Sequence, residues 1–449
     1  MSDPLLDPID RLLEDAQLVS LSTQALASRS AASQLLGRQS IAPDRLLRCL
    51  VLKHLKGWSY RQLHRELRAS LLYRRFTRFY EDPIPDYSTL CRAFALFGKE
   101  ATEQIHRHIL HQATAAKVVA GKQLRIDTTA VETNIHYPSD SSLLADSVRV
   151  MTRYLKRMVA GCQDSKFKIL DHARATKYRL LEISRAARIL TPAGQEQLRA
   201  SYQQLIRLTK KVRAQAAAVL LARSTQELML RPHGLKQVLA AEAALQDCLP
   251  LIDQVIAQSQ ARIFEHQTRY PGKILSLFEA HSTVIRKGKA HKPNEFGRLV
   301  RIDEVENGLV SNYFVAPGNL GDQQQWIPAL HAHIELFGRA PYLAAADRGF
   351  FSAANESAAY QLGIKQVVLP ACGRLSHARA AVQKKPWFRR GQAWRAGIEA
   401  RMSTLKHRFG LQRAYYKGEL GFERHVGWSI IAHNLVAISR LTQQRCRSG

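Results

Sequence analysis

Three acidic residues that lie far apart in the sequence stand in contexts suited to shared chemistry. Asp127 ends a short alternating run that begins at Gln123, Asp347 follows an apolar run, and Glu399 lies in a helical pattern. Carboxylates from neighbouring strands and a helix can hold two divalent ions about 4 Å apart, as cleaving or joining a phosphodiester requires. Mg²⁺ suits such an oxygen-only ligand set. The three acids are therefore the candidate residues for such a site.

The segment from Arg395 to Lys406 surrounds Glu399 with cations. On a single helix Arg395, Glu399, Met402 and Lys406 would fall within a sector of about 60°. A lone carboxylate among cations stays ionised and can bind a divalent ion while its neighbours bind phosphates. The alternative is a solvated helix face with an i, i+4 ion pair between Arg395 and Glu399.

The elements that must position Asp347 form a predicted β-α-β unit. Residues 342–346 read as a strand, Ser352 caps a helix that ends at Gly363, and residues 364–369 read as the next strand. Open α/β sheets place their chemistry beyond the carboxyl ends of such strands. We therefore expect Asp347 at the edge of a sheet where functional residues gather, beyond the carboxyl ends of the strands.

A β-hairpin is predicted between the first acid and the second. The runs 298–306 and 309–316 flank Asn307-Gly308, the strongest short hairpin signal. We expect the hairpin acids Asp303, Glu304 and Glu306 to face solvent and to have no function.

The charge balance points to nucleic acid as the partner. Of 449 residues, 66 are Lys or Arg and 37 are Asp or Glu, which gives a net charge of +29. Such an excess repels itself unless a polyanion compensates. An anionic membrane surface or the ribosome is the alternative, but the excess is spread along the whole chain. With 46% hydrophobic residues, the chain can also bury substantial cores.

Two regions offer cations to a DNA backbone. Arg61 and Arg65 lie on the polar face of a helix that Ser59 caps, and short basic helices of this kind suit a helix-turn-helix. A small helical bundle with a basic surface explains them equally well. The basic loop with Arg286, Lys287 and Lys289 contains a glycine that lets the backbone approach a phosphate chain. A solvated loop is the alternative there.

Metal sites built on cysteine or histidine are not indicated. The six cysteines are widely separated without a Cys-x-x-Cys pair, so they read as reduced cytosolic residues. The histidines at 106, 108, 111, 331 and 333 lack convergent Cys or carboxylate partners and read as ordinary helix-surface residues. No apolar run reaches the length of a membrane span. We expect a soluble cytoplasmic protein without a membrane partner.

At this point the chain resembles a bacterial insertion-sequence transposase of the DDE type. The helical region Leu46 to Phe97 is similar to the N-terminal domain of that group. The segments that resemble its other motifs are Arg125-Ile-Asp127-Thr-Thr-Ala-Val, Ala346-Asp347-Arg-Gly-Phe350 and Ala432-His-Asn434-Leu. Arg395-x₃-Glu399-x₆-Lys406 matches the signature Tyr-x₂-Arg-x₃-Glu-x₆-Lys except that Gln392 stands in place of the Tyr.

The resemblance implies an α/β fold: an RNase H-like mixed sheet with helices, preceded by an all-helical N-terminal domain. The implied parts are a helical DNA-binding or dimerisation domain (1–120), the first catalytic strand (121–142), a helical insertion (143–270) and the rest of the catalytic domain (271–449). The all-helical pattern from about Leu143 to Phe264 agrees with the insertion.

The resemblance also implies roles for single residues. Asp127, Asp347 and Glu399 would be catalytic and would bind two Mg²⁺ ions, with Mn²⁺ as an alternative. Arg395 and Lys406 would hold transposon-end DNA, and Arg348, Arg286, Lys287, Lys289, Arg61 and Arg65 complete the predicted DNA-binding set.

The implied activity is DNA transposition: metal-dependent cleavage at the terminal repeats of an insertion sequence, then strand transfer into target DNA. The partners would be double-stranded DNA and a second copy of the chain in a homodimeric synaptic complex, with the protein associated with the nucleoid. Two other functions remain open: a DNA-binding regulator with idle acids, and a stand-alone nuclease of the same fold that cuts DNA without joining it.

Overall fold

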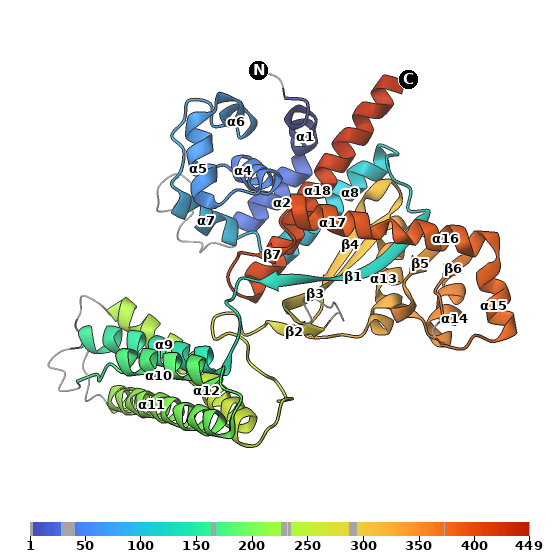
Figure 1. The fold of residues 1–449 in the computed structure, drawn as a ribbon. Helices are drawn as coiled ribbons and strands as arrows, with labels where there is room; N and C mark the ends of the chain where they lie inside the picture. Colours follow the sequence, from blue (N-terminus) through green and yellow to red (C-terminus); the bar gives the residue numbers. More distant parts are fainter. Residues whose placement is uncertain are drawn as a thin grey trace. The chain divides into compact units, whose positions relative to one another are not determined.

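The computed structural model describes residues 3–27, 41–162, 168–225, 231, 235–286, 294–371 and 373–448 (Figure 1). The chain divides into two compact units. Unit 1 comprises residues 1–134 and 284–449, and unit 2 comprises residues 135–283. Because unit 2 interrupts unit 1, residues that are distant in the sequence meet within one unit.

Unit 1 is built on a seven-stranded mixed sheet. Strands β3 and β4 run antiparallel to their neighbours, whereas β1, β5 and β6 pair in parallel. The path is β2-β3-β1-β5-β6, with β4 paired to β3 and β7 to β1. The mixed α/β class predicted from the sequence is confirmed. The strands are β1 (Gln123–Thr133), β2 (Thr283–Arg286), β3 (Asn294–Val305), β4 (Val310–Val315), β5 (Leu343–Ala346), β6 (Gln366–Val368) and β7 (Arg413–Ala414).

Both faces of the sheet are covered by helices, so its central strands are apolar on both sides. Ala344 and Ala346 pack in one core with Trp326 of α13 (Asp322–Phe337). The alternating residues Leu343 and Ala345 pack with a phenylalanine of α16 (Pro386–Ala396) on the other face. Figure 1 shows α14 (Ala353–Gln361), α15 (His377–Lys384) and α16 at the β5–β6 side of the sheet.

The predicted hairpin and β-α-β unit are confirmed. Asn307 (φ 62°) and Gly308 (φ 76°) both adopt positive φ in the turn η1 (Glu306–Gly308), which joins antiparallel β3 and β4. Two positive φ angles give the turn a twist that matches the strands. The expected solvent exposure of the hairpin acids was wrong, because Asp303 is 1% exposed and Glu304 is 0% exposed. Both side chains are buried between the sheet and its covering helices, where arginines neutralise them.

The N-terminal helices share one hydrophobic core with the sheet and with α18 (Glu419–Ser448). Residues 1–120 therefore form no separate compact unit in the part of the chain that the structure describes. These helices are α1 (Leu6–Leu13), α2 (Ala16–Ala27), α4 (Pro43–Lys56), α5 (Tyr60–Ala69), α6 (Leu71–Phe76), α7 (Tyr87–Ala95) and α8 (Lys99–Ala115).

Helix α18 begins at Glu419, and its central part is buried nearly all round, with Trp428, Ile431 and Asn434 each at 0% exposure. Figure 1 shows α18 passing between the N-terminal helices and the sheet. A helix that has neighbours on every side buries polar residues too, provided that they form hydrogen bonds.

Unit 2 is a helical bundle with its own apolar core. Leu155, Leu205, Val212, Leu245 and Ile252 are among the residues that fill this core. Its helices are α9 (Asp140–Ala160), α10 (Ala173–Ala186), α11 (Pro192–Ser224) and α12 (Leu235–Phe264). No helix in the described residues of either unit is both long enough and apolar enough to cross a membrane.

Acidification is expected to destabilise unit 1. Burial lowers the pKa of His106, His425 and His433 to about 4 each, whereas an unfolded histidine titrates near 6.5. Between these values the unfolded chain binds protons that the folded chain does not, so stability falls as the pH falls. From about pH 7 to about pH 5 the loss should be on the order of 1 to 2 kcal/mol per histidine.

Thermal unfolding followed by circular dichroism at a series of pH values measures this effect. The variant His106→Gln removes one of the three titrating groups and should show a shallower pH dependence of Tm. A Tm that does not change across this range in the wild-type protein would contradict the prediction.

Candidate active site

Asp127 and Asp347 are neighbours at one edge of the sheet. In the parallel pairing of β1 with β5, Ile126 lies beside Ala346, so the next residue of each chain segment is an aspartate. Strand β5 ends there and the short helix η2 (Arg348–Phe350) begins, with Gly349 N donating a 2.8 Å hydrogen bond to Asp347 Oδ1. The register of two parallel strands therefore brings the first two predicted acids together.

Glu399 and Arg395 lie on two helices, not on the single helix expected from the sequence. Helix α16 ends at Ala396 and α17 (Ile398–Arg408) begins after Gly397. The predicted common sector was wrong, because Met402 is buried in the apolar core whereas the Glu399 side chain is 73% exposed. Although the helix is broken between α16 and α17, Arg395 and Glu399 both lie at the edge of the sheet that carries Asp127 and Asp347.

Arg395 contacts all three acids. Its Nη2 lies 2.8 Å from Asp127 Oδ2 and 3.8 Å from Asp347 Oδ2, and its Nη1 lies 3.7 Å from Glu399 Oε1. Three carboxylates this close together repel one another unless a cation lies between them. The guanidinium supplies that counter-charge at the point where the three acids converge.

A fourth acid, Asp322, was missed by the sequence analysis. It begins α13, and Thr128 Oγ1 donates a 3.1 Å hydrogen bond to its Oδ1. A Cβ built on Gly349 would meet Asp322 Oδ2 at 2.9 Å and Asp347 Oδ1 at 3.0 Å, so both carboxylates lie on the same side of this glycine. In the sequence, Asp322 directly follows Gly-Asn-Leu-Gly and therefore looks like an ordinary helix start. Only the folded sheet places Asp322 beside Asp347.

The donor atoms of this cluster fit a hard divalent cation. The oxygens of Asp127 and Asp347 already converge on one cationic nitrogen, and carboxylate oxygens are the ligands that Mg²⁺ and Mn²⁺ prefer. The exposed side chain of Glu399 has room to turn towards them. Within the described residues, however, no group of three His, Cys, Asp or Glu side chains forms a ready-made metal site. The residues that could complete such a site are the three acids that Arg395 now joins.

The predicted DNA-binding residues outside the acid cluster lie on several elements. Arg61 is exposed on α5 with its guanidinium 4.9 Å from the centre of the Tyr87 ring, and Arg65 forms an exposed ion pair with Glu66. Arg348 is exposed next to Asp347.

Two other members of this set lie in described elements, one at the end of β2 and one in α17. Lys406 is half-buried in the last turn of α17, and Arg286 is exposed at the end of β2. Lys287 and Lys289 lie outside the described residues.

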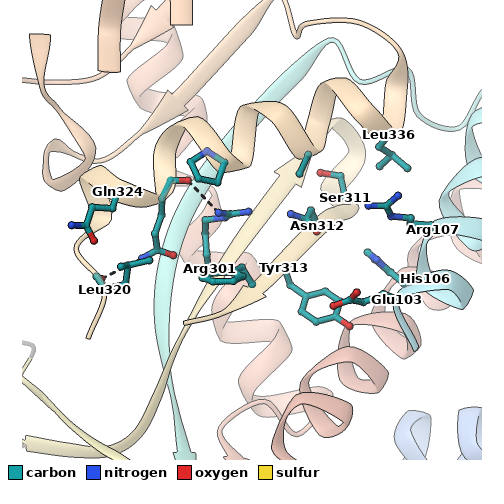
Figure 2. A pocket seen from close by; sticks show the side chains of 14 residues that line it. Glu103, His106, Arg107, Arg301, Ser311, Asn312, Tyr313, Leu320, Gln324 and Leu336 are labelled. Carbon is teal, nitrogen blue, oxygen red and sulfur yellow. Dashed lines mark hydrogen bonds between the residues drawn. The ribbon is translucent and has the colours of Figure 1, made fainter. Parts of the chain in front are cut away.

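A cavity of about 310 Å³ lies away from the acid cluster, between α8, β4 and α13. Figure 2 shows that Glu103 and Arg107 approach it from α8, and that Asn312 and Tyr313 approach it from β4. None of the three predicted acids lines this cavity.

Two of the histidines expected on helix surfaces are buried instead. His106 Nε2 lies 3.0 Å from the Val310 carbonyl oxygen, and His333 Nε2 lies 3.0 Å from that of Gly121. Both side chains satisfy backbone groups of the fold.

Two family models match the chain. A model described as "Transposase domain (DUF772)" matches residues 2–96, and a model described as "Transposase DDE domain" matches residues 304–435. The chain belongs to the insertion-sequence DDE transposases. The second match contains Asp347, Arg395 and Glu399, whereas Asp127 lies outside both matches. Comparisons of this DDE transposase with curated proteins and with solved structures gave no match.

Replacing Arg395 is expected to strengthen divalent cation binding in the DNA-free transposase. The variant Arg395→Gln removes the cation that now lies among the acids, so Mn²⁺ should bind roughly threefold to tenfold more tightly, the equivalent of roughly 0.7 to 1.4 kcal/mol. A Mn²⁺ titration followed by electron paramagnetic resonance measures the affinity. The matched control is Arg389→Gln, on the exposed side of the same helix. Weaker Mn²⁺ binding by Arg395→Gln would show instead that the arginine is needed to hold the acids in place.

Proposed function

We propose that this protein is an active transposase that cleaves DNA at the ends of its insertion sequence and joins those ends to target DNA in a metal-dependent reaction. The observation that carries the proposal is the convergence of Asp127, Asp347 and Glu399 on one guanidinium. In a protein without catalytic activity, nothing would require these three acids, which come from three different elements, to lie within reach of one cation.

The sheet supports an RNase H-like catalytic domain. With β4 beside β3, the neighbouring strands β4, β3 and β1 are antiparallel, and β5 and β6 follow β1 in parallel. In this arrangement the first acid lies on the central strand and the second lies at the end of the adjacent parallel strand. Unit 2 would then be an insertion after the first catalytic strand.

In the proposed mechanism Asp127, Asp347 and Glu399 hold divalent cations, with Mg²⁺ as the natural ion for carboxylate ligands. Such ions, when bound, activate a water or a 3′-hydroxyl and stabilise the leaving oxygen. The cluster is open to solvent on the side of Glu399, so a DNA strand can reach it. Asp127 is more enclosed, with 15% of its side chain exposed.

The cations of the chain would hold the DNA. Arg395 would leave the acids for a phosphate of the transposon end, and Lys406 would bind the same strand from the last turn of α17. The exposed Arg61, Arg65, Arg286 and Arg348 would contact the backbone, and the net charge of +29 attracts the duplex from a distance. Synapsis of two ends would require a dimer. Binding to the bacterial nucleoid follows from the same charge.

Neutralising any one of the three acids is expected to abolish cleavage and leave DNA binding intact. For Asp127→Asn, Asp347→Asn and Glu399→Gln, the rate of Mg²⁺-dependent cleavage of end DNA should fall by roughly 100- to 1000-fold, because metal ligation supplies several kcal/mol in the transition state. A gel assay with labelled end DNA measures cleavage, and an electrophoretic mobility shift measures binding.

The matched control for Asp127→Asn is Glu132→Gln. Glu132 lies on the same strand, pairs with Arg413 at 2.6 Å and has 14% of its side chain exposed, so it resembles Asp127 in burial but lies away from the acid cluster. The control should cleave at close to the wild-type rate. Cleavage by Asp347→Asn at the wild-type rate would overturn the proposal, and cleavage without joining in a strand-transfer assay would favour the stand-alone nuclease.

A further inference from the structure

Glu304, at the end of β3, is fully buried and binds two arginines that come from the elements carrying the predicted catalytic acids. Arg125 lies on β1, two residues before Asp127, and Arg401 lies on α17, two residues after Glu399. A buried carboxylate without such partners would be strongly destabilising, so the geometry of this group is tightly constrained.

Arg125 links Glu304 to the segment that holds Arg395. It lies opposite Glu304 in the β1–β3 pairing and donates from Nε to Oε2 at 3.0 Å and from Nη2 to Oε1 at 2.6 Å. Its third nitrogen, Nη1, donates to the carbonyl oxygen of Trp394, and its guanidinium lies 4.9 Å from the centre of the Trp394 ring. Because Trp394 directly precedes Arg395, these contacts tie the last turn of α16 to β1.

Arg401 links Glu304 to the helix that holds Glu399. Its Nε donates to Glu304 Oε1 at 3.2 Å, and its Nη1 lies 2.9 Å from His433 Nε2. Burial lowers the pKa of His433 to about 4, so the ring is neutral at pH 7 and Nε2 is free to accept. His433 Nδ1 lies 3.1 Å from Asn434 Oδ1, which places the proton on Nδ1. The start of α17 is thereby tied to both the sheet and α18.

Two glycines make room for these guanidiniums. A Cβ on Gly397, at the junction of α16 and α17, would lie 2.5 Å from Arg125 Nη1. A Cβ on Gly308, in the hairpin turn, would lie 1.9 Å from Arg401 Nη2. Each arginine therefore occupies space that exists only because a glycine stands beside it.

We propose that Glu304 is the positioning residue of the acid cluster: through Arg125 and Arg401 it holds the junction of α16 and α17, and with it Arg395 and Glu399, against the strand that carries Asp127. The proposal rests on the proposed function of the three acids. Glu304 acts through the two arginines, so its loss should loosen the junction and misplace Glu399 without removing any ligand. Partners of this kind typically contribute 10- to 100-fold to the activity of a metal site.

The test compares Glu304→Gln with Asp303→Asn. Asp303 is the adjacent residue on β3, is equally buried, and binds Arg301 through both oxygens at 2.8 and 2.9 Å. Successive residues of a strand point to opposite faces, and Arg301 donates to the Gln325 carbonyl oxygen of α13, on the other side of the sheet. Both variants therefore break a buried ion pair, but only Glu304→Gln acts on the junction.

Two measurements on the full chain are needed: the rate of end-DNA cleavage at saturating DNA, and hydrogen exchange of peptides covering residues 386–408. For Glu304→Gln we expect cleavage to fall by about 10- to 100-fold and exchange in these peptides to rise. For Asp303→Asn cleavage should stay within about threefold of wild type, with exchange in these peptides unchanged. Equal effects of the two variants on both measurements would overturn the positioning role.

The two measurements separate this inference from the proposed function. If the wild-type protein does not cleave DNA but Glu304→Gln still raises exchange selectively in residues 386–408, the transposase activity is refuted while the positioning of the junction is supported. If Glu304→Gln does not fold, Arg401→Lys takes its place, because lysine keeps the buried charge but lacks the second nitrogen that reaches His433. The same selective rise in exchange is then expected, and its absence would overturn the inference.

Discussion

The parallel pairing of β1 with β5 is the constraint on which the rest of unit 1 depends. In this register Ile126 lies beside Ala346, and the two following residues are aspartates that end up side by side. A shift of one residue would exchange the faces on which Leu343 and Ala344 pack and would separate the acids. The same apolar packing that stabilises the sheet therefore also fixes the spacing of the first two acids.

Electrostatic compensation is the second requirement, and the chain meets it with arginine. Arg395 lies among three carboxylates, and Arg125 and Arg401 share the buried Glu304. The planar guanidinium can bind several oxygens at once, which an ammonium group does less well. Part of the large basic excess is thus used inside the protein, where it holds acids together.

The N-terminal helices and α18 bind the two ends of the chain into the same core as the sheet. His433 and Asn434 of α18 contact Arg401 and the first residue of β4, so α18 is tied to both α17 and the sheet. The first family match, over residues 2–96, therefore lies in a region that is structurally continuous with the sheet of unit 1.

By itself the sequence determined the local elements and the resemblance to the DDE transposases. Asn307-Gly308 encodes a hairpin because both residues tolerate positive φ, and the runs around Asp127 and Asp347 encode strands, with Asp127 inside β1 and Asp347 directly after β5. Only the tertiary structure decided that Glu304 is buried, that Gly397 divides the helix carrying Arg395 from that carrying Glu399, and that Asp322 joins the acids. The reason is physical: local patterns report on neighbours along the chain, whereas burial and charge compensation depend on which distant arginine or helix arrives at the same place.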